Sequence, residues 1–236
     1  MSFWRRCAGA TELLLLLLVA AVPAGAEEVR GTVQLLAKGG KGPARGADVS
    51  QAVVYWEPAG GAKARAANPP AVPFVMTTRK KQFMPRLLTV PRGSQVRFPN
   101  QDPILHNVFS VSPGNAFDLG LYRAGDGKTQ RFDQPGLVRV FCNVHHDMVA
   151  YVLVLDTPYF VSPRADGSFT LSGLPPGKGK LTVWHEQADP WTADLQLPAG
   201  KPVAARVEVV RPRVPPHLNK SGKSYFQSGR DRYNQP

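Results

Sequence analysis

Long stretches of apolar residues at helical spacing are missing from this sequence after its first 26 residues. No segment beyond Ala26 repeats apolar side chains every three or four positions over the length of a helix, which argues against a mainly helical fold. Glycine and proline are plentiful instead, with 22 and 23 residues among 236, as is natural for short strands joined by many turns. We therefore expect an all-β globular protein with one large domain or two small ones.

A continuous apolar run lies near the N-terminus, at residues 13–22. Arg5 and Arg6 precede this run, and small residues at 24–26 follow it. This is the layout of a cleaved secretory signal, so we predict that residues 1–26 are removed after about Ala26 and that the protein is periplasmic. The run is shorter than the roughly 20 residues that span a bilayer, so we expect no stable membrane insertion after cleavage.

Cysteine is equally scarce. Cys7 lies in the predicted signal, which leaves Cys142 as the one cysteine of the mature chain. A disulfide within the monomer is therefore excluded. An unpaired thiol in an exported protein is a liability unless something occupies it, and a metal ion is one such occupant.

Acidic residues are outnumbered, with 17 Asp and Glu against 29 Lys and Arg, for a formal net charge of +12. Because the protein is predicted to be exported, we do not expect nucleic acid as a partner. The net positive charge instead favours acidic protein surfaces or anionic lipid as partners. Much of the charge lies in residues 211–236, which carry a net charge of +5. We predict that this basic tail is disordered and solvated, including His217.

Many short segments rich in Val, Phe, Tyr and Leu end at Gly, Pro, Asn or Asp, as strands do. The eleven clearer ones are residues 29–36, 52–56, 87–90, 95–98, 105–111, 129–132, 137–142, 149–155, 168–171, 180–185 and 204–210. We expect the aromatic stretch at residues 117–122 to be a loop that packs against the neighbouring strands. The stretch between residues 60 and 73 is expected to be a connecting loop.

Two patterns divide these strands into two predicted β-sandwiches. The segment Asp166-Gly167-Ser168-Phe169 followed by Gly173-Leu174-Pro175-Pro176-Gly177 resembles the transthyretin-like, or carboxypeptidase regulatory-like, domain. That resemblance implies a discontinuous domain, residues 27–66 with 157–210, into which a domain of residues 74–156 is inserted. Sequential β-domains and a single enlarged sandwich are the alternatives.

The chemistry is concentrated in one short loop. Cys142, His145 and Met148 follow one another at intervals of three residues, between two β-rich segments. In a continuous strand Cys142 and His145 would point to opposite faces about 10 Å apart, so only a tight turn brings the three side chains to one ion. Upstream, His106 interrupts an otherwise apolar strand. Two imidazoles, one thiolate and a weak axial thioether make up the ligand set of a blue-copper site.

These residues resemble the type 1 copper, or cupredoxin, family over residues 74–156, and the short loop is most similar to that of amicyanin. The resemblance implies a Greek-key β-sandwich with one copper ion, Cu⁺ or Cu²⁺, bound by His106, Cys142, His145 and Met148. It implies that Asn107, beside the first histidine, ties the two ligand loops together and helps to hold the thiolate. It further implies electron transfer between redox proteins, such as a periplasmic dehydrogenase of methylamine utilisation and a c-type cytochrome, without enzymatic catalysis.

Several alternatives stay open at this point. His146 competes with His145 as a ligand, and Asp147 offers an oxygen donor. Zinc is a rival metal, although methionine is a poor fourth ligand for it. A nucleophilic role for Cys142 lacks a supporting motif. Copper delivery, storage or sensing is the alternative function, and small-molecule chemistry at an open coordination position is another.

Overall fold

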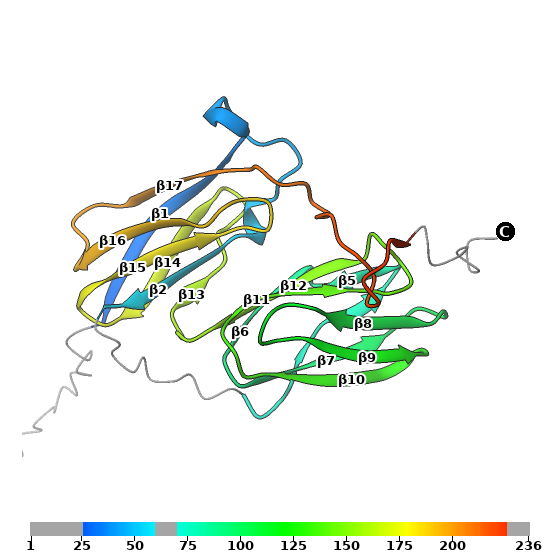
Figure 1. The fold of residues 1–236 in the computed structure, drawn as a ribbon. Helices are drawn as coiled ribbons and strands as arrows, with labels where there is room; N and C mark the ends of the chain where they lie inside the picture. The colour runs from blue at the N-terminus through cyan, green and yellow to red at the C-terminus, as the bar shows by residue number, and fades with distance from the viewer. Residues whose placement is uncertain (1–25, 60–69, 226–236) are drawn as a thin grey trace, which may run out of the picture.

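The structure is a computed structural model that describes residues 26–59 and 70–225. These residues form strands β1 to β17 and two short 3-10 helices, η1 (Lys38–Gly40) and η2 (Val49–Gln51). The all-β prediction is confirmed: the strands make two β-sandwiches (Figure 1). No helix in the described ranges is long and apolar enough to cross a membrane. The predicted signal up to residue 25, most of the 60–73 stretch and residues 226–236 of the tail lie outside the described residues.

The central sandwich holds strands β3 to β12. One of its sheets has the order β10-β7-β4-β5, with β3 beside β7, and the other has the order β6-β12-β11-β8-β9. The strands are β3 (Phe74–Val75), β4 (Thr77–Arg79), β5 (Gln82–Met84), β6 (Leu87–Pro91), β7 (Ser94–Asn100), β8 (His106–Ser110), β9 (Phe117–Tyr122), β10 (Gly125–Phe132), β11 (Gly136–Phe141) and β12 (Val149–Leu155). Phe98, Phe132 and Val140 are buried in the core of this sandwich.

The flanking sandwich combines strands from both sides of the central one in the chain. Its two sheets have the orders β14-β1-β17 and β13-β2-β15-β16. The strands are β1 (Glu27–Leu36), β2 (Val53–Pro58), β13 (Phe160–Val161), β14 (Ser168–Leu174), β15 (Gly177–Trp184), β16 (Trp191–Leu197) and β17 (Val203–Glu208). Strands within residues 27–58 thus pair with strands within residues 160–208, and the central strands lie between these two segments in the sequence. Membership of this sandwich in the transthyretin-like family stays a prediction.

Strand β12 connects the two sandwiches because it is buried on both faces. Its even-numbered residues from 150 to 154 join the central core, and its odd-numbered residues from 149 to 155 pack with Val53 and Trp184 of the flanking sandwich. Each fully buried aliphatic side chain contributes about 1.5–3 kcal/mol to stability. The uninterrupted apolar sequence of β12 therefore reflects a strand enclosed between two layers.

Two expectations about loops are wrong. Residues 117–122 form strand β9 rather than a loop, because they pair with β8 from His106↔Tyr122 to Ser110↔Phe117. Residues 211–225 of the tail follow a defined path over both sandwiches rather than being disordered. Many of them are exposed, but Asn219 is buried and His217 stacks on Phe141 with ring centroids 4.3 Å apart. The prediction of disorder rested on the low hydrophobicity and high charge of this segment. It failed because the contacts that hold the segment are made with residues far away in the sequence, which composition does not show.

His185, next to the end of β15, is buried and hydrogen-bonded. Its Nδ1 accepts a hydrogen bond from the Gln187 N–H at 3.3 Å, and the backbone carbonyl of Asp48 accepts from the ring. Burial lowers the pKa of His185 below its ordinary value of 6.5. The neutral ring is therefore the form that the folded protein holds.

We expect His185 to make the protein less stable in mild acid. Because its pKa is lower in the folded than in the unfolded chain, the unfolded chain binds more protons just below pH 6.5, so stability falls as pH decreases through that range and is flat above it. Urea unfolding at a series of pH values checks this, and His185→Gln should flatten the dependence. An equally steep dependence in the variant would assign the effect to other groups.

Candidate metal centre

The loop of residues 142–148 is a tight hairpin connection between β11 and β12. These strands pair antiparallel up to Phe141↔Val149. Inside the loop, the Cys142 N–H donates to the Met148 carbonyl at 3.2 Å, and the Met148 N–H donates to the His145 carbonyl at 3.2 Å. These bonds turn the chain back on itself, so that Cys142 and His145 face the same space instead of opposite faces of a strand.

His106 enters the same space from strand β8. This strand lies beside β11, with Phe109 opposite Phe141 in an antiparallel register. Continuing that register toward the start of β8 brings His106 alongside the loop that follows Cys142. His106 and Cys142 are both completely buried, so the donors meet inside the sandwich rather than on its surface.

The side chains of His106, Cys142 and His145 converge. The Cys142 Sγ lies 3.8 Å from the His106 Nδ1 and 3.7 Å from the His145 Nδ1, and one donor atom from each residue lies within 4.8 Å of the others. Ligands about 2.0–2.3 Å from an ion at trigonal angles are separated by about 3.5–4 Å. The two sulfur–nitrogen distances are therefore those expected if all three side chains bind a single metal ion.

The electrostatics of Cys142 favour a bound cation. Burial raises the pKa of the thiol, and backbone N–H groups of Asn107, Val144 and His145 that point at the sulfur lower it by less. The buried thiolate therefore needs a positive charge beside it. Three N–H donors orient the sulfur, and a metal ion bound there would supply the missing charge.

Asp102 fixes the ring of His106, a role that the sequence analysis missed. The Asp102 Oδ2 lies 2.9 Å from the His106 Nε2, so Nε2 carries the proton and Nδ1 is left as the acceptor that faces Cys142. Burial alone would raise the pKa of Asp102, but N–H groups of Lys81 and Lys80 and the ring of His106 outweigh it and leave that pKa lowered. Asp102 lies in the loop before β8 rather than on a helix, so its spacing of four residues from His106 carried no signal of this contact.

Asn107 connects the centre to strand β9. Its backbone N–H points at the Cys142 sulfur, while its side-chain amide donates to the Asp118 Oδ1 at 2.6 Å. The side chain thus bonds to β9, and the backbone supplies the contact with the thiol. Asp118, in the stretch that was expected to be a loop, thus has a structural role beside the centre.

Met148 and His146 occupy different environments. Met148 is buried in the hydrophobic cluster that contains Cys142, at the end of the ligand loop. A cavity of about 230 Å³ lies beside Met148 and is also lined by Phe83 and Arg86. His146 is outside the donor cluster: its ring stacks on His217 at 4.6 Å, and its Nδ1 lies 3.1 Å from the Asp147 carboxylate.

Comparisons with known proteins found similar solved structures but no matching family. No family model and no curated protein matches the chain. Among solved structures, amicyanin from Paracoccus versutus is 26% identical over 38% of this chain and 88% of its own, with a TM-score of 0.33. A reduced Cu(I) form of an amicyanin variant is 22% identical over 38% of this chain and 89% of its own, with a TM-score of 0.34. A purple cupredoxin from Nitrosopumilus maritimus is 21% identical over 35% and 99%, with a TM-score of 0.32.

The central sandwich is cupredoxin-like. It has two facing sheets, with one histidine on a strand and the cysteine at the start of a hairpin loop. The cupredoxin-like sandwich is accompanied by a second β-sandwich, as the fold prediction has it.

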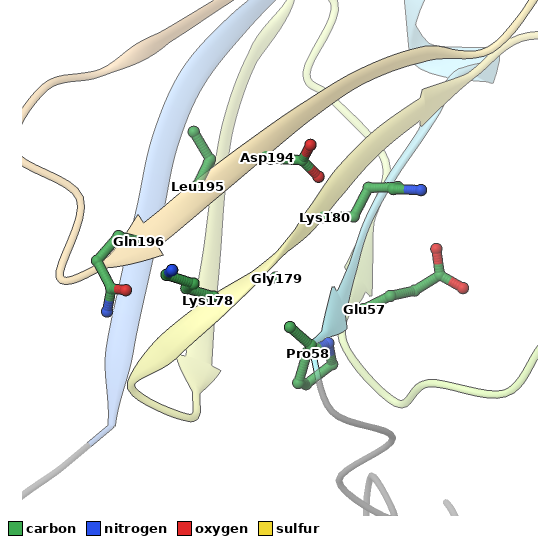
Figure 2. A pocket seen from close by; sticks show the side chains of 9 residues that line it. Glu57, Pro58, Lys178, Gly179, Lys180, Asp194, Leu195 and Gln196 are labelled. Carbon is green, nitrogen blue, oxygen red and sulfur yellow. The ribbon is translucent and has the colours of Figure 1, made fainter.

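A second hollow lies in the flanking sandwich, and its chemistry differs. This groove of about 730 Å³ runs over β2, β15 and β16 (Figure 2). Lys180 stands opposite Glu57 on one side and Asp194 on the other in the strand register, so the charges compensate one another. The lining holds no cysteine or histidine, and the candidate metal centre is therefore the one in the cupredoxin-like sandwich.

Proposed function

We propose that this chain binds one copper ion through His106, Cys142, His145 and Met148 and transfers single electrons between protein partners. The observation that carries the proposal is the buried, unpaired thiol of Cys142 with an imidazole Nδ1 at 3.8 Å and another at 3.7 Å. Thiolate and imidazole are both good ligands for copper. The thioether of methionine is a much better ligand for copper than for zinc. When bound, copper supplies a centre that alternates between two oxidation states one electron apart.

The protein contributes to electron transfer by fixing the positions of the metal-binding side chains. His106 is fixed by Asp102 and by its strand, and Cys142 is held by three backbone N–H groups. Neighbouring strands β8, β11 and β12 constrain the loop on both sides. A fixed compromise geometry reduces the rearrangement that accompanies each electron transfer, which favours an electron carrier over an enzyme.

The proposed partners are redox proteins, such as a c-type cytochrome or a periplasmic dehydrogenase in an amicyanin-like pathway of methylamine use. Export by a cleaved signal would place the protein in the periplasm with them. The basic net charge, +12 for the full sequence and +11 without the predicted signal (Arg5 and Arg6 less Glu12), supports an acidic partner surface. Copper delivery, storage or sensing is the second candidate, and the covering of the ligand loop described below favours it.

Addition of copper to the purified protein tests the proposal. We expect intense blue absorption from sulfur-to-copper charge transfer, lost on reduction and restored on reoxidation. Tight Cu⁺ binding without this spectrum would support delivery or storage instead. Failure to bind either copper ion would contradict the metal site itself.

A further inference from the structure

Residues 211–225 run from the flanking sandwich to the ligand loop (Figure 1). The Arg211 N–H donates to the Gln187 carbonyl at 3.0 Å, which holds the start of the segment on the flanking sandwich. The Arg213 carbonyl then accepts a hydrogen bond from Arg86 of the central sandwich. The chain therefore arrives at the ligand loop along a defined path.

The end of the segment forms hydrogen bonds with the ligand loop itself. The Tyr225 hydroxyl donates to the Cys142 carbonyl at 2.9 Å. The Lys220 N–H donates to the Asn143 side-chain oxygen at 3.0 Å. Both acceptors belong to the stretch from Cys142 to His145, so the segment covers the start of that stretch directly.

Aromatic rings extend the cover across the loop. The His217 ring lies between Phe141, at 4.3 Å and 16°, and His146, at 4.6 Å and 12°. The Tyr225 ring meets the rings of His146 and His217 edge-on, at 5.1 Å and 5.3 Å. Two rings of the tail and two rings of the loop region thus form one packed group.

A third set of contacts reaches the side of the first histidine. The Lys220 Nζ lies 2.7 Å from the Asp118 Oδ2, and the other oxygen of Asp118 holds the amide of Asn107. The buried side chain of Asn219 accepts hydrogen bonds from the N–H groups of Ser221 and Lys223, both at 3.0 Å. The segment is therefore a folded turn with its own internal bonds.

His145 lies within the covered loop, between Asn143 and His146, which both contact the segment. In a cupredoxin-type carrier, the edge of this histidine is where electrons would leave, and here its Nε2 atom is buried. The ion pair of Lys220 with Asp118 is partly exposed, with side-chain exposures of 36% and 41%. Contacts of this kind open locally at a lower free energy than the whole fold.

From these contacts we infer that residues 215–225 form a cap over the ligand loop, which must move aside before another protein exchanges electrons or copper at His145. The cap is an intramolecular occupant of the surface that a partner would use. That electrons or copper are what is exchanged at His145 rests on the proposed function. The cap itself is tested without metal.

The metal-free test measures how fast N-ethylmaleimide alkylates Cys142 in the full chain, with peptide mass spectrometry to separate Cys142 from Cys7. Deletion of residues 215–236 should accelerate alkylation about tenfold or more, because the thiol becomes accessible through smaller openings. Deletion of residues 226–236 alone is the matched control and should leave the rate unchanged. Equal rates in all three proteins would overturn the cap.

Point variants keep the test decisive if the long deletion disturbs folding. His217→Ala removes the central ring of the stack, and Tyr225→Phe removes only the hydrogen bond to Cys142. Both should accelerate alkylation without a matching loss of urea stability. Acceleration that merely follows a loss of global stability would count against a local cap.

With copper bound, the same deletion should speed oxidation of the reduced protein by ferricyanide and leave the visible spectrum unchanged. An unchanged oxidation rate would contradict the cap. If the intact chain takes up no copper, the proposed function fails, while the alkylation rates still decide whether the cap exists.

Discussion

Replacing Cys142 with serine is expected to abolish the visible absorption of the copper-loaded protein. A serine hydroxyl stays protonated at neutral pH. It replaces the polarisable sulfur ligand with a hard oxygen, which binds copper more weakly. Copper affinity should fall by more than about a hundredfold, since loss of an outer contact alone costs 10- to 100-fold. Copper titration followed by absorption and electron paramagnetic resonance measures both effects.

His146→Ala is the control for this prediction, because His146 neighbours a donor but faces His217. The variant should keep its colour, while His145→Ala should lose it. The reverse pattern would show that the two histidines exchange roles when copper binds. Unchanged absorption in Cys142→Ser would remove the sulfur from the centre altogether.

Much of the fold is visible in the sequence, because core strands carry a strong apolar signal. Each of the eleven predicted strands overlaps an observed one, and residues 149–155 match strand β12 in full. Four of the strands that were missed, β3, β4, β5 and β13, have only two or three residues. Such short strands exist through pairing with their neighbours rather than through a periodic pattern of their own.

The two longer strands that were missed differ in their signal. In β16, Trp191, Ala193, Leu195 and Leu197 alternate with polar residues, so a period of two was available. In β9, Gly120 interrupts the pattern at a φ of 69°, and the pairing with β8 is irregular. Strand β9 was therefore recognisable only from its partner.

The donors of the metal centre were chosen by residue type and spacing, and the structure brings His106, Cys142 and His145 together. The contacts around them were harder to foresee, because they join distant segments. Lys220 meets Asp118, and Tyr225 meets Cys142. The composition of residues 211–225 does not predict these contacts.

Replacing Arg86 with methionine is the second change expected to have a large effect, here on stability. The Arg86 Nε donates to both carboxylate oxygens of Glu186, at 3.0 Å and 2.7 Å, across the junction of the two sandwiches. Its Nη1 donates to the Val149 carbonyl at 2.9 Å. The side chains of Arg86 and Glu186 are only 17% and 8% exposed, so the variant leaves a buried carboxylate without its cation.

We expect Arg86→Met to lower the free energy of unfolding by about 3 kcal/mol or more at pH 7, as for other broken buried pairs. Burial already raises the pKa of Glu186 despite Arg86, and without Arg86 it rises further, so the deficit should shrink as pH falls and the carboxylate takes up a proton. Arg92→Met is the matched control, because Arg92 and Asp156 are each 52% exposed, and it should cost below about 1 kcal/mol. Urea unfolding at pH 5 and pH 7 measures both variants. Equal small losses would show that the pair at the junction is no stronger than one on the surface.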